Sequence, residues 1–413
     1  MPRRAHLGSL ISIGFVCLAA LPAATSAQQR DWPSWRGPNG NSISDESGWD
    51  PNSLAPEPKI LWRARVGDGY SSVSIKGEHL YTMGYMDGRD TVYCLAVATG
   101  KEIWRYTYPC IAGSYAGPRA TPVFSDSLLY TLSREGGLYC FDAQTGKVKW
   151  RKNLKTQANT EIPRWGTSSS AVVEGSLLLL NVGKYGLALD KQNGDVIWQS
   201  PREVPGYASP VPYDLDGKRC AVMFGRDAAY GVAVETGELL WTKKWHTRME
   251  EHSSDPIVWD GNVFISSIYS KGCTLFSVAK GTPREIWLND KLVTKFSTSV
   301  LFEGNLYGIH GNTGRGTLRC LDFETGATRW EEKFKFASPI IVDGKLIILD
   351  EKGMLYIAKA SPDGYDELSR GQVLQPDRTS RGKWWTAPVL CRGMIFCRND
   401  RGAMACVDVR KSR

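Results

Sequence analysis

The chain has little of what catalytic, redox and nucleic-acid-binding proteins show in their sequences. It contains five histidines, one of them near the N-terminus, so groups for base chemistry are few. Its ten cysteines include no adjacent pair, no C-x-x-C and no C-x-x-C-H, which leaves a metal, redox or c-type haem site without sequence support. No dense run of Lys or Arg occurs, and a net charge of +8 over 413 residues does not indicate a nucleic-acid partner.

Sustained helical periodicity is absent outside the N-terminal leader, residues 1–27. The leader has the features of a signal peptide: Arg3 and Arg4, a short apolar run, and small residues up to Ala27. Because the apolar run is too short to be a good membrane span, we expect an exported protein, periplasmic or extracellular, with no transmembrane segment in the mature chain. Residues 28–58 are rich in Pro, Gly, Ser and Asn and are predicted to form an extended arm that lies on a single domain, residues 59–413.

A stretch of about a dozen residues recurs throughout that domain. Residues 139–150 read YCFDAQTGKVKW, residues 93–104 read YCLAVATGKEIW, and residues 319–330 read RCLDFETGATRW. The tryptophans that end these stretches are 42 to 48 residues apart, and such a fixed period indicates a repeat architecture. We expect these tryptophans to pack between neighbouring repeats; they are Trp62, Trp104, Trp150, Trp198, Trp241, Trp287 and Trp330.

Each period also holds a second turn, usually an acidic residue followed by glycine, between two runs of β-forming residues. Four short antiparallel strands per period correspond to one blade of a β-propeller, as in WD40 proteins. Eight such turns predict eight blades. The last repeat lacks its fourth strand, and we expect residues 59–65, which precede the first complete repeat, to supply that strand and close the ring.

Cysteines recur at one repeat position, at Cys94, Cys140, Cys320 and Cys406. Equivalent positions in different blades lie too far apart for disulfides, so these residues are predicted to be small buried core residues.

The repeat C/A-L/V-D-x-x-T-G-x-x-x-W resembles that of the quinoprotein-like, or PQQ-like, propeller family. The resemblance covers residues 59–413 and implies an eight-bladed fold. This family includes dehydrogenases that use pyrroloquinoline quinone (PQQ) and calcium, and also non-catalytic members such as the outer-membrane assembly lipoprotein BamB. The opening DWPSWRGP, residues 31–38, looks like that of exported BamB-like proteins. The chain lacks the vicinal cysteines and the long insertions of the dehydrogenases, although binding of PQQ and calcium stays possible.

Two sets of polar and aromatic residues depart from the repeat and form the candidate ligand or partner surface. The first follows the second strand of each blade and comprises Arg134, Lys184, Arg226, His310, Asp350, Arg398 and Asp400. The second precedes the first strand and comprises Arg119, Arg164, Trp165, Trp384 and Trp385. Aromatic and arginine side chains are typical of interaction hot spots.

No convincing catalytic constellation emerges, and the sequence favours an exported, non-catalytic propeller that acts as a protein-binding or assembly scaffold with envelope partners. A monomer is expected. The alternatives are a PQQ- and calcium-dependent oxidoreductase and a carbohydrate-binding propeller, for which exposed Trp165, Trp384 and Trp385 on one face would be the signature.

Overall fold

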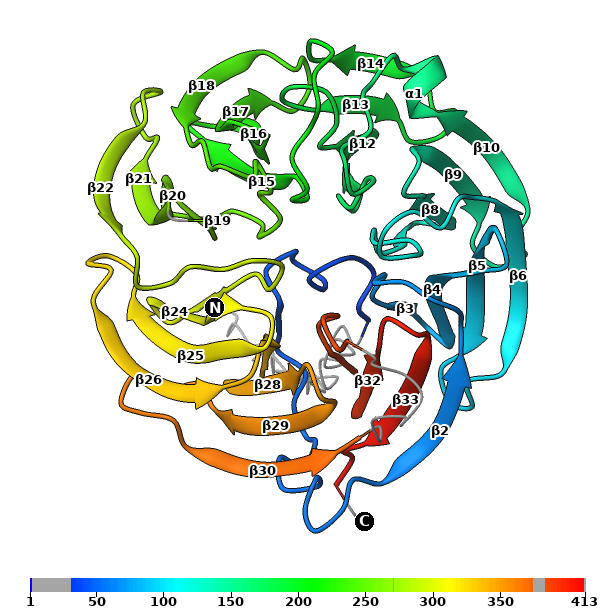
Figure 1. Cartoon of the computed structure of the whole chain (residues 1–413), viewed down its shortest axis with the longest axis vertical. Helices are drawn as coiled ribbons and strands as arrows, with labels where there is room; N and C mark the ends of the chain where they lie inside the picture. The colour runs from blue at the N-terminus through cyan, green and yellow to red at the C-terminus, as the bar shows by residue number, and fades with distance from the viewer. Residues whose placement is uncertain (2–30, 270, 374–382, 412–413) are drawn as a thin grey trace.

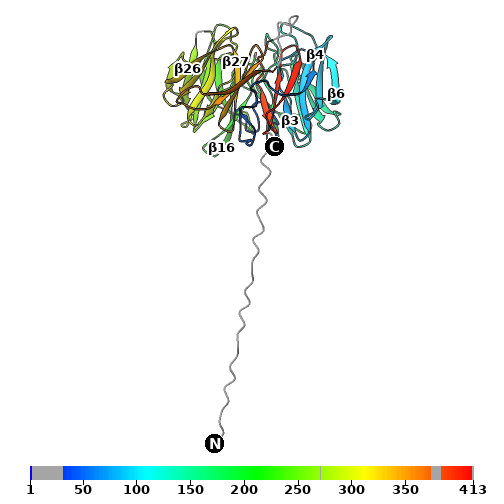
Figure 2. The same ribbon diagram turned by 90° about the horizontal axis from the view of Figure 1, so that it is seen from below.

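The computed structural model describes residue 1 and residues 31–269, 271–373 and 383–411. Eight sheets are arranged in a ring (Figure 1), which confirms the predicted all-β, eight-bladed propeller. Seen from the side, the ring is a thick disc (Figure 2). The predicted signal peptide, beyond Met1, lies outside the described residues. The described helix, α1 (Leu154–Gln157), has four residues, and no helix in these ranges is long and apolar enough to cross a membrane.

The strands of each blade are labelled A to D from the axis outwards. Blade 1 consists of β3 (Ser74–Lys76), β4 (His79–Met86), β5 (Arg89–Ala96) and β6 (Glu102–Pro109). Blade 2 consists of β7 (Val123–Ser125), β8 (Leu128–Leu132), β9 (Gly137–Asp142) and β10 (Val148–Asn153). Blade 3 consists of β11 (Val172–Glu174), β12 (Leu177–Leu180), β13 (Leu187–Asp190) and β14 (Val196–Gln199). Blade 4 consists of β15 (Val211–Leu215), β16 (Lys218–Phe224), β17 (Ala228–Ala233) and β18 (Leu239–Lys244).

The remaining blades follow the same order. Blade 5 consists of β19 (Ile257–Trp259), β20 (Asn262–Ser267), β21 (Gly272–Ser277) and β22 (Arg284–Asn289). Blade 6 consists of β23 (Val300–Phe302), β24 (Asn305–Asn312), β25 (Arg315–Asp322) and β26 (Thr328–Phe334). Blade 7 consists of β27 (Ala337–Val342), β28 (Lys345–Asp350), β29 (Met354–Lys359) and β30 (Glu367–Gln372). Blade 8 consists of β31 (Val389–Cys391), β32 (Met394–Arg398), β33 (Ala403–Asp408) and β2 (Ile60–Arg65).

The ring closes as predicted, with an N-terminal strand completing the C-terminal blade. β2 pairs antiparallel with β33, and Trp62 lies opposite Cys406 in this register. The arm before β2 adds β1 (Ile43–Ser44), which pairs parallel with the innermost strand of blade 7. Closure joins β2 to the last blade and leaves no gap between blades.

The turns show why the repeat carries its characteristic residues. In blade 2, one carboxylate oxygen of Asp142 accepts hydrogen bonds from the backbone N–H and the hydroxyl of Thr145, at 2.9 and 2.7 Å. Gly146 follows with a φ of 69°, a conformation that favours glycine. The same arrangement recurs at Asp322 and Thr325 in blade 6. The Asp-x-x-Thr-Gly motif therefore encodes the C–D hairpin.

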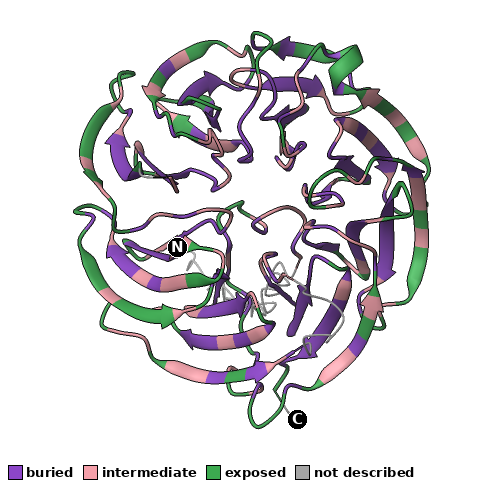
Figure 3. Ribbon diagram, viewed as in Figure 1, coloured by how far each residue is buried: buried purple, intermediate pink, exposed green. Residues whose placement is uncertain are grey.

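The core lies between the blades. Strands B and C are buried over most of their lengths, whereas the outermost strands alternate between exposed and partly buried residues (Figure 3). All nine described cysteines, including the four at the repeat position, are buried, and no disulfide joins any two of them. They act as small core side chains, in agreement with the prediction.

Alternation of strand direction puts the B–C and D–A loops on one face of the disc, here called the funnel face, and the A–B and C–D turns on the other. The described part of the arm, residues 31–58, crosses the centre of the ring (Figure 1). Asp31 binds the turn of blade 1, where it accepts from the Gly77 N–H at 3.1 Å and pairs with Lys76 at 2.8 Å. Glu46 accepts from the N–H groups of Arg392 and Gly393 in the turn of blade 8.

Candidate functional site

Loops from seven blade junctions meet at the axis on the funnel face and enclose a cavity of about 400 Å³, here called the funnel. Most of its lining comes from D–A loops, which lie next to the innermost strands, and Tyr269 and Thr313 come from B–C loops. The volume is that of a small-molecule pocket. Its main aromatic and charged lining residues are Trp35, Tyr70, Tyr115, Arg119, Trp165, Tyr207, Glu251, Asp255, Tyr269, Lys295, Phe296, Lys383 and Trp385.

The arm supplies Trp35, which closes the axial end of the funnel. Its indole N–H donates to Oδ2 of Asp255 at 2.7 Å, while Oδ1 accepts from the backbone N–H of Ser209 at 2.7 Å. The guanidinium of Arg36 lies 3.8 Å from the same carboxylate, and both charged groups are buried. Burial raises the pKa of Asp255, and Arg36 opposes that shift. The arm is therefore tied into the ring by a buried hydrogen bond from Trp35 and a buried charge pair with Arg36, both to Asp255.

Aromatic rings form a connected wall around one side of the funnel. Trp385 stacks on Tyr70, with ring centres 5.7 Å apart and planes 22° apart, and lies 4.9 Å from Phe296. Tyr115 continues the wall, 6.3 Å from Trp385 and edge-on to Trp165 at 5.8 Å. These distances are typical of favourable aromatic pairs. The wall thus offers ring faces and edges contributed by several blades.

Two of the charged residues in the funnel are already satisfied by neighbouring groups. Glu251 accepts from the indole N–H of Trp165 at 2.6 Å and from the Tyr269 hydroxyl at 2.9 Å. Arg119 donates to the carbonyl oxygens of three residues of its own loop, and its guanidinium lies over the Tyr70 ring. Burial lowers the pKa of Arg119 to about 10. Both side chains shape the loops of the funnel.

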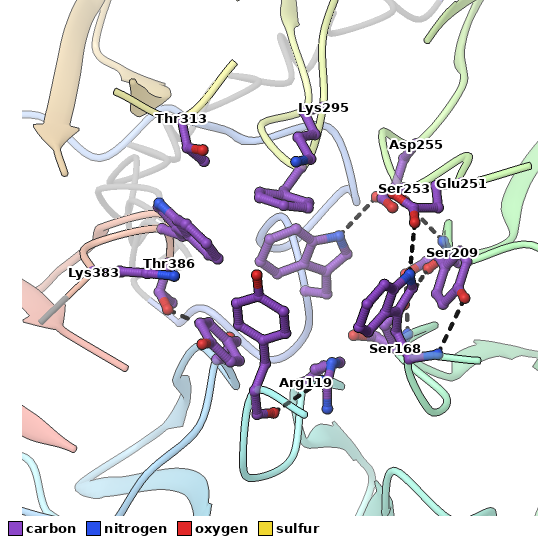
Figure 4. Close-up of a pocket in the computed structure, with 18 of the residues that line it drawn as sticks. Arg119, Ser168, Ser209, Glu251, Ser253, Asp255, Lys295, Thr313, Lys383 and Thr386 are labelled. Atoms are coloured by element: carbon purple, nitrogen blue, oxygen red, sulfur yellow. Dashed lines mark hydrogen bonds between the residues drawn. The ribbon is translucent and has the colours of Figure 1, made fainter. Parts of the chain in front are cut away.

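The two lysines of the funnel place their ammonium groups beside aromatic rings. Lys383 places its ammonium 4.5 Å from the Trp385 ring centre and 4.7 Å from that of Tyr115. Lys295 lies 4.9 Å from the Phe296 ring centre, and burial lowers its pKa. Neither ammonium forms an ion pair with a carboxylate in the described part of the chain. Figure 4 shows both side chains reaching the aromatic-lined space from different loops.

The structure brings three of the sequence-predicted surface residues together in the funnel: Arg119, Trp165 and Trp385. Arg164 lies beside them, with its guanidinium 4.8 Å from the Trp165 ring centre. Three other predicted residues are not part of the funnel lining: Lys184 and Arg226 lie on the B–C loops of blades 3 and 4, and His310 lies in β24. Lys184 pairs with Glu203 and Arg226 pairs with Glu250, while Nδ1 of His310 accepts from the Val293 N–H.

Five predicted surface residues are buried and hold the fold together. These are Arg134, Asp350, Trp384, Arg398 and Asp400. The charged groups of four of them satisfy backbone atoms: Asp350 accepts from the N–H groups of its own B–C turn, and Asp400 accepts from the Lys383 N–H at 2.7 Å. Arg134 donates to carbonyl oxygens of the neighbouring D–A loop. Loops packed near the axis have unpaired backbone groups, and these side chains provide the partners.

Sequence reasoning missed Tyr70, Tyr115, Lys295 and Phe296 as funnel residues and placed Trp35 only within the extended arm, residues 28–58. The first four share a signal: each lies in the segment between a blade tryptophan and the next strand A. Superimposing the repeats would have placed these segments at one position around the axis. Trp35 has no such signal, because it lies outside the repeats and reaches the funnel through the fold.

The residues of the funnel do not fit a calcium-bound quinone. Calcium takes about six to eight oxygen ligands, several from carboxylates. The two carboxylates that line the funnel, Glu251 and Asp255, already accept hydrogen bonds from neighbouring side chains and backbone. Within the described ranges no cluster of three His, Cys, Asp or Glu side chains could hold a metal ion.

The ring of eight repeat-built blades defines the chain as an eight-bladed β-propeller. The profile of the family described as outer membrane protein assembly factor BamB matches residues 88–332, and the chain belongs to this family. The family model thus covers the greater part of the ring, from the B–C hairpin of blade 1 to the last strand of blade 6.

Similar proteins include both assembly factors and enzymes. The assembly factor BamB of Burkholderia pseudomallei is 24% identical over 72% of this chain and 75% of its own length. Tetrathionate hydrolase of Acidithiobacillus ferrooxidans is 23% identical over 55% of this chain and 46% of its own. The crystal structure of BamB from Moraxella catarrhalis matches with a TM-score of 0.62 and 17% identity, covering 86% of this chain and 98% of that one. Quinohemoprotein alcohol dehydrogenase from Comamonas testosteroni matches with a TM-score of 0.67 and 12% identity, covering 94% and 82%. The structural matches show a shared fold.

Proposed function

We propose that the protein is an exported, monomeric, non-catalytic scaffold that binds other proteins during outer-membrane assembly, on the periplasmic side. Membership of the family described as outer membrane protein assembly factor BamB supports this role. The fold suits it, because a closed propeller offers a rigid disc whose loops can vary without disturbing the blades.

The observation that carries the proposal is a group of exposed apolar side chains on the funnel face, here called the apolar patch and made of Met86, Ile111 and Tyr115. They are 60%, 62% and 49% exposed. Met86 lies at the tip of the β4–β5 hairpin, and the segment leading to Ile111 is bound to this hairpin through the Cys110 N–H and the Gly88 carbonyl, 3.0 Å apart. Large exposed apolar side chains on adjacent loops are typical of a protein-binding surface.

Most other exposed large apolar residues occupy a different environment. Ile103, Val196, Ile197, Leu239, Ile286 and Leu288 lie on outermost strands. Side chains on such strands alternate between core and solvent, so single exposed residues there are ordinary. They provide matched controls for the apolar patch.

A deletion strain tests the proposal. We expect loss of the gene to lower the amounts of β-barrel proteins in the outer membrane, measured by quantitative mass spectrometry, and the wild-type gene to restore them. Met86→Asp combined with Ile111→Asp should fail to restore them, whereas Ile197→Asp, a control that is 50% exposed on β14, should succeed. Unchanged β-barrel levels after deletion would contradict the function, and full restoration by the double variant would contradict the assignment to the apolar patch.

A further inference from the structure

We propose that the funnel is a binding site for an acidic saccharide, a sugar unit that carries a carboxylate or a sulfate. This inference does not depend on the role in outer-membrane assembly. The funnel shares Tyr115 with the apolar patch, but the test of the patch changes only Met86 and Ile111.

The first argument is charge. Glu251 is occupied by Trp165 and Tyr269, and Asp255 by Trp35 and Ser209. Arg119 donates to its own loop. The ammonium groups of Lys295 and Lys383 are therefore the charged groups of the described lining that have no hydrogen-bond or ion-pair partner, and the carboxylate of Glu251 acts on Lys295 only through its charge. Two cations against a low-polarity wall attract an anion more strongly than they would in open water.

The second argument is shape. A ligand in the funnel meets the rings of Trp385, Tyr115 and Trp165, which come from separate loops. Flat, partly apolar molecules bury their faces against such rings, as the C–H faces of sugar rings do. A cavity of about 400 Å³ has room for more than one sugar ring. The wall therefore favours a ligand built from rings over an inorganic anion.

The third argument separates a sugar from an aromatic acid. The hydroxyls of Tyr70, Tyr115 and Ser253 line the funnel and make no hydrogen bond to any described residue. Hydroxyls that water can reach are hydrogen-bonded to water, and a ligand that displaces this water must supply partners or leave them unpaired, which weakens its binding. Sugar hydroxyls both donate and accept, whereas an aromatic acid offers only its carboxylate. The hydroxyls thus favour a saccharide.

The test is titration of the purified protein, followed by tryptophan fluorescence and calorimetry, with three trisaccharides. One consists of galacturonic acid, one of sulfated galactose and one of neutral galactose. We expect saturable binding of at least one acidic trisaccharide, at least tenfold tighter than the neutral one, and the two acidic probes distinguish carboxylate from sulfate. Binding should weaken as salt is added, because the attraction is electrostatic.

Variants assign the binding to the funnel. Lys295→Met combined with Lys383→Met should weaken acidic trisaccharide binding at least tenfold, and the corresponding Arg variants should retain it. The control Lys218→Met removes an exposed lysine of β16 that pairs with Glu238, and it should leave binding unchanged. Trp385→Ala should abolish binding, with its circular dichroism spectrum and melting temperature checked against wild type.

Three results would overturn the inference. They are absence of binding by both acidic trisaccharides, equal or tighter binding of 2-naphthoate or of an acidic hexapeptide, and retention of affinity in the double lysine-to-methionine variant. Each is independent of the deletion experiment, so the saccharide site can fail while the assembly function stands, and the reverse.

Discussion

The indole of Trp104 in blade 1 covers Gly146 in the C–D turn of blade 2 so closely that a Cβ on this glycine would lie 2.6 Å from the ring. The indole N–H donates to the Ala143 carbonyl of the same turn at 2.9 Å. The relationship recurs around the ring: Trp62 covers Gly100, Trp150 covers Gly194, Trp198 covers Gly237 and Trp287 covers Gly326. The tryptophan and the glycine of the repeat therefore act across the junction between blades.

Gly146→Ala should destabilise the ring by about 2 to 4 kcal/mol, measured by urea unfolding. A left-handed alanine costs about 1 to 2 kcal/mol, and displacement of the Trp104 ring adds to that. Gly217→Ala is the control, because Gly217 has a similar φ of 75° in an A–B turn but nothing within 4 Å of its Cβ position. Gly217→Ala should lose only the stability that the left-handed alanine backbone costs, about 1 to 2 kcal/mol. Equal losses in the two variants would contradict the role of the Trp104 contact.

The same relationship explains how far the sequence could predict the fold. Turn, strand and tryptophan lie within a dozen residues, so the blade and its period are visible in local patterns. The funnel is different, because Trp35 binds Asp255 across 220 positions and lysines from two junctions share one cavity. Arg398 and Asp400 were predicted to be surface residues but are buried, since a charged residue after strand B looks the same in sequence whether it contacts water or backbone groups.

Arg398 joins the last blade to the first and should be among the residues most important for ring closure. It is 2% exposed, and its Nη1 donates to the carbonyls of Ser71 and Met83 and to the Thr82 hydroxyl, at 2.8, 2.7 and 2.9 Å. Arg398→Ala would leave these acceptors unpaired and open a cavity. We expect a loss of about 3 to 5 kcal/mol in the free energy of unfolding.

A second variant separates the hydrogen bonds of Arg398 from its charge, and a variant of Arg401 serves as the control. Arg398→Lys keeps the charge but not the planar fork of donors, and should lose about half as much as alanine. Arg401→Ala removes an exposed arginine that pairs with Asp68 at 3.2 Å, and should cost less than about 1 kcal/mol. A loss at Arg398 no larger than at Arg401 would show that the junction does not depend on these bonds.

Asp90 should make the protein less stable as the pH rises from about 4 to about 7. Its carboxylate is buried, neither oxygen has a hydrogen-bond partner among the described residues, and burial raises its pKa from 3.8 to about 6. Because the folded chain holds this proton more tightly than the unfolded chain, deprotonation favours unfolding. Asp90→Asn should therefore be more stable than wild type by about 1 to 3 kcal/mol at pH 7 and similar to it at pH 4.

The stability of Asp90→Asn must be compared with that of wild type at each pH separately, since the titration of His252 changes the stability of both proteins in the opposite direction. Its ring is fully buried and stacked on Phe224, and burial lowers its pKa to about 4, so its contribution to stability is lost as the pH falls from 6.5 towards 4. Asp195→Asn, at an exposed position, is the control and should show no pH-dependent difference. A stability gain of Asp90→Asn that is equal at pH 4 and pH 7 would exclude the carboxyl as its source.

The bond between Trp35 and Asp255 should be energetically measurable as a coupling between the arm and blade 5. Trp35→Phe keeps an aromatic ring at the end of the funnel but removes the N–H that donates to the buried carboxylate. In a double-mutant cycle with Asp255→Asn, we expect a coupling of about 1.5 to 3 kcal/mol in urea unfolding, the range for hydrogen bonds to charged groups.

The matched cycle pairs Trp35→Phe with Glu251→Gln. Glu251 also lines the funnel, but its carboxylate accepts from Trp165 and Tyr269, so its coupling to Trp35 should stay below about 0.5 kcal/mol. If both cycles gave the same small value, the arm would be held by its other contacts, among them those of Asp31, Glu46 and β1. If only the Asp255 cycle gives a large coupling energy, the bond between Trp35 and Asp255 holds the arm across the axis. A ligand that displaced Trp35 would then have to break the hydrogen bond between its indole and the buried Asp255 carboxylate.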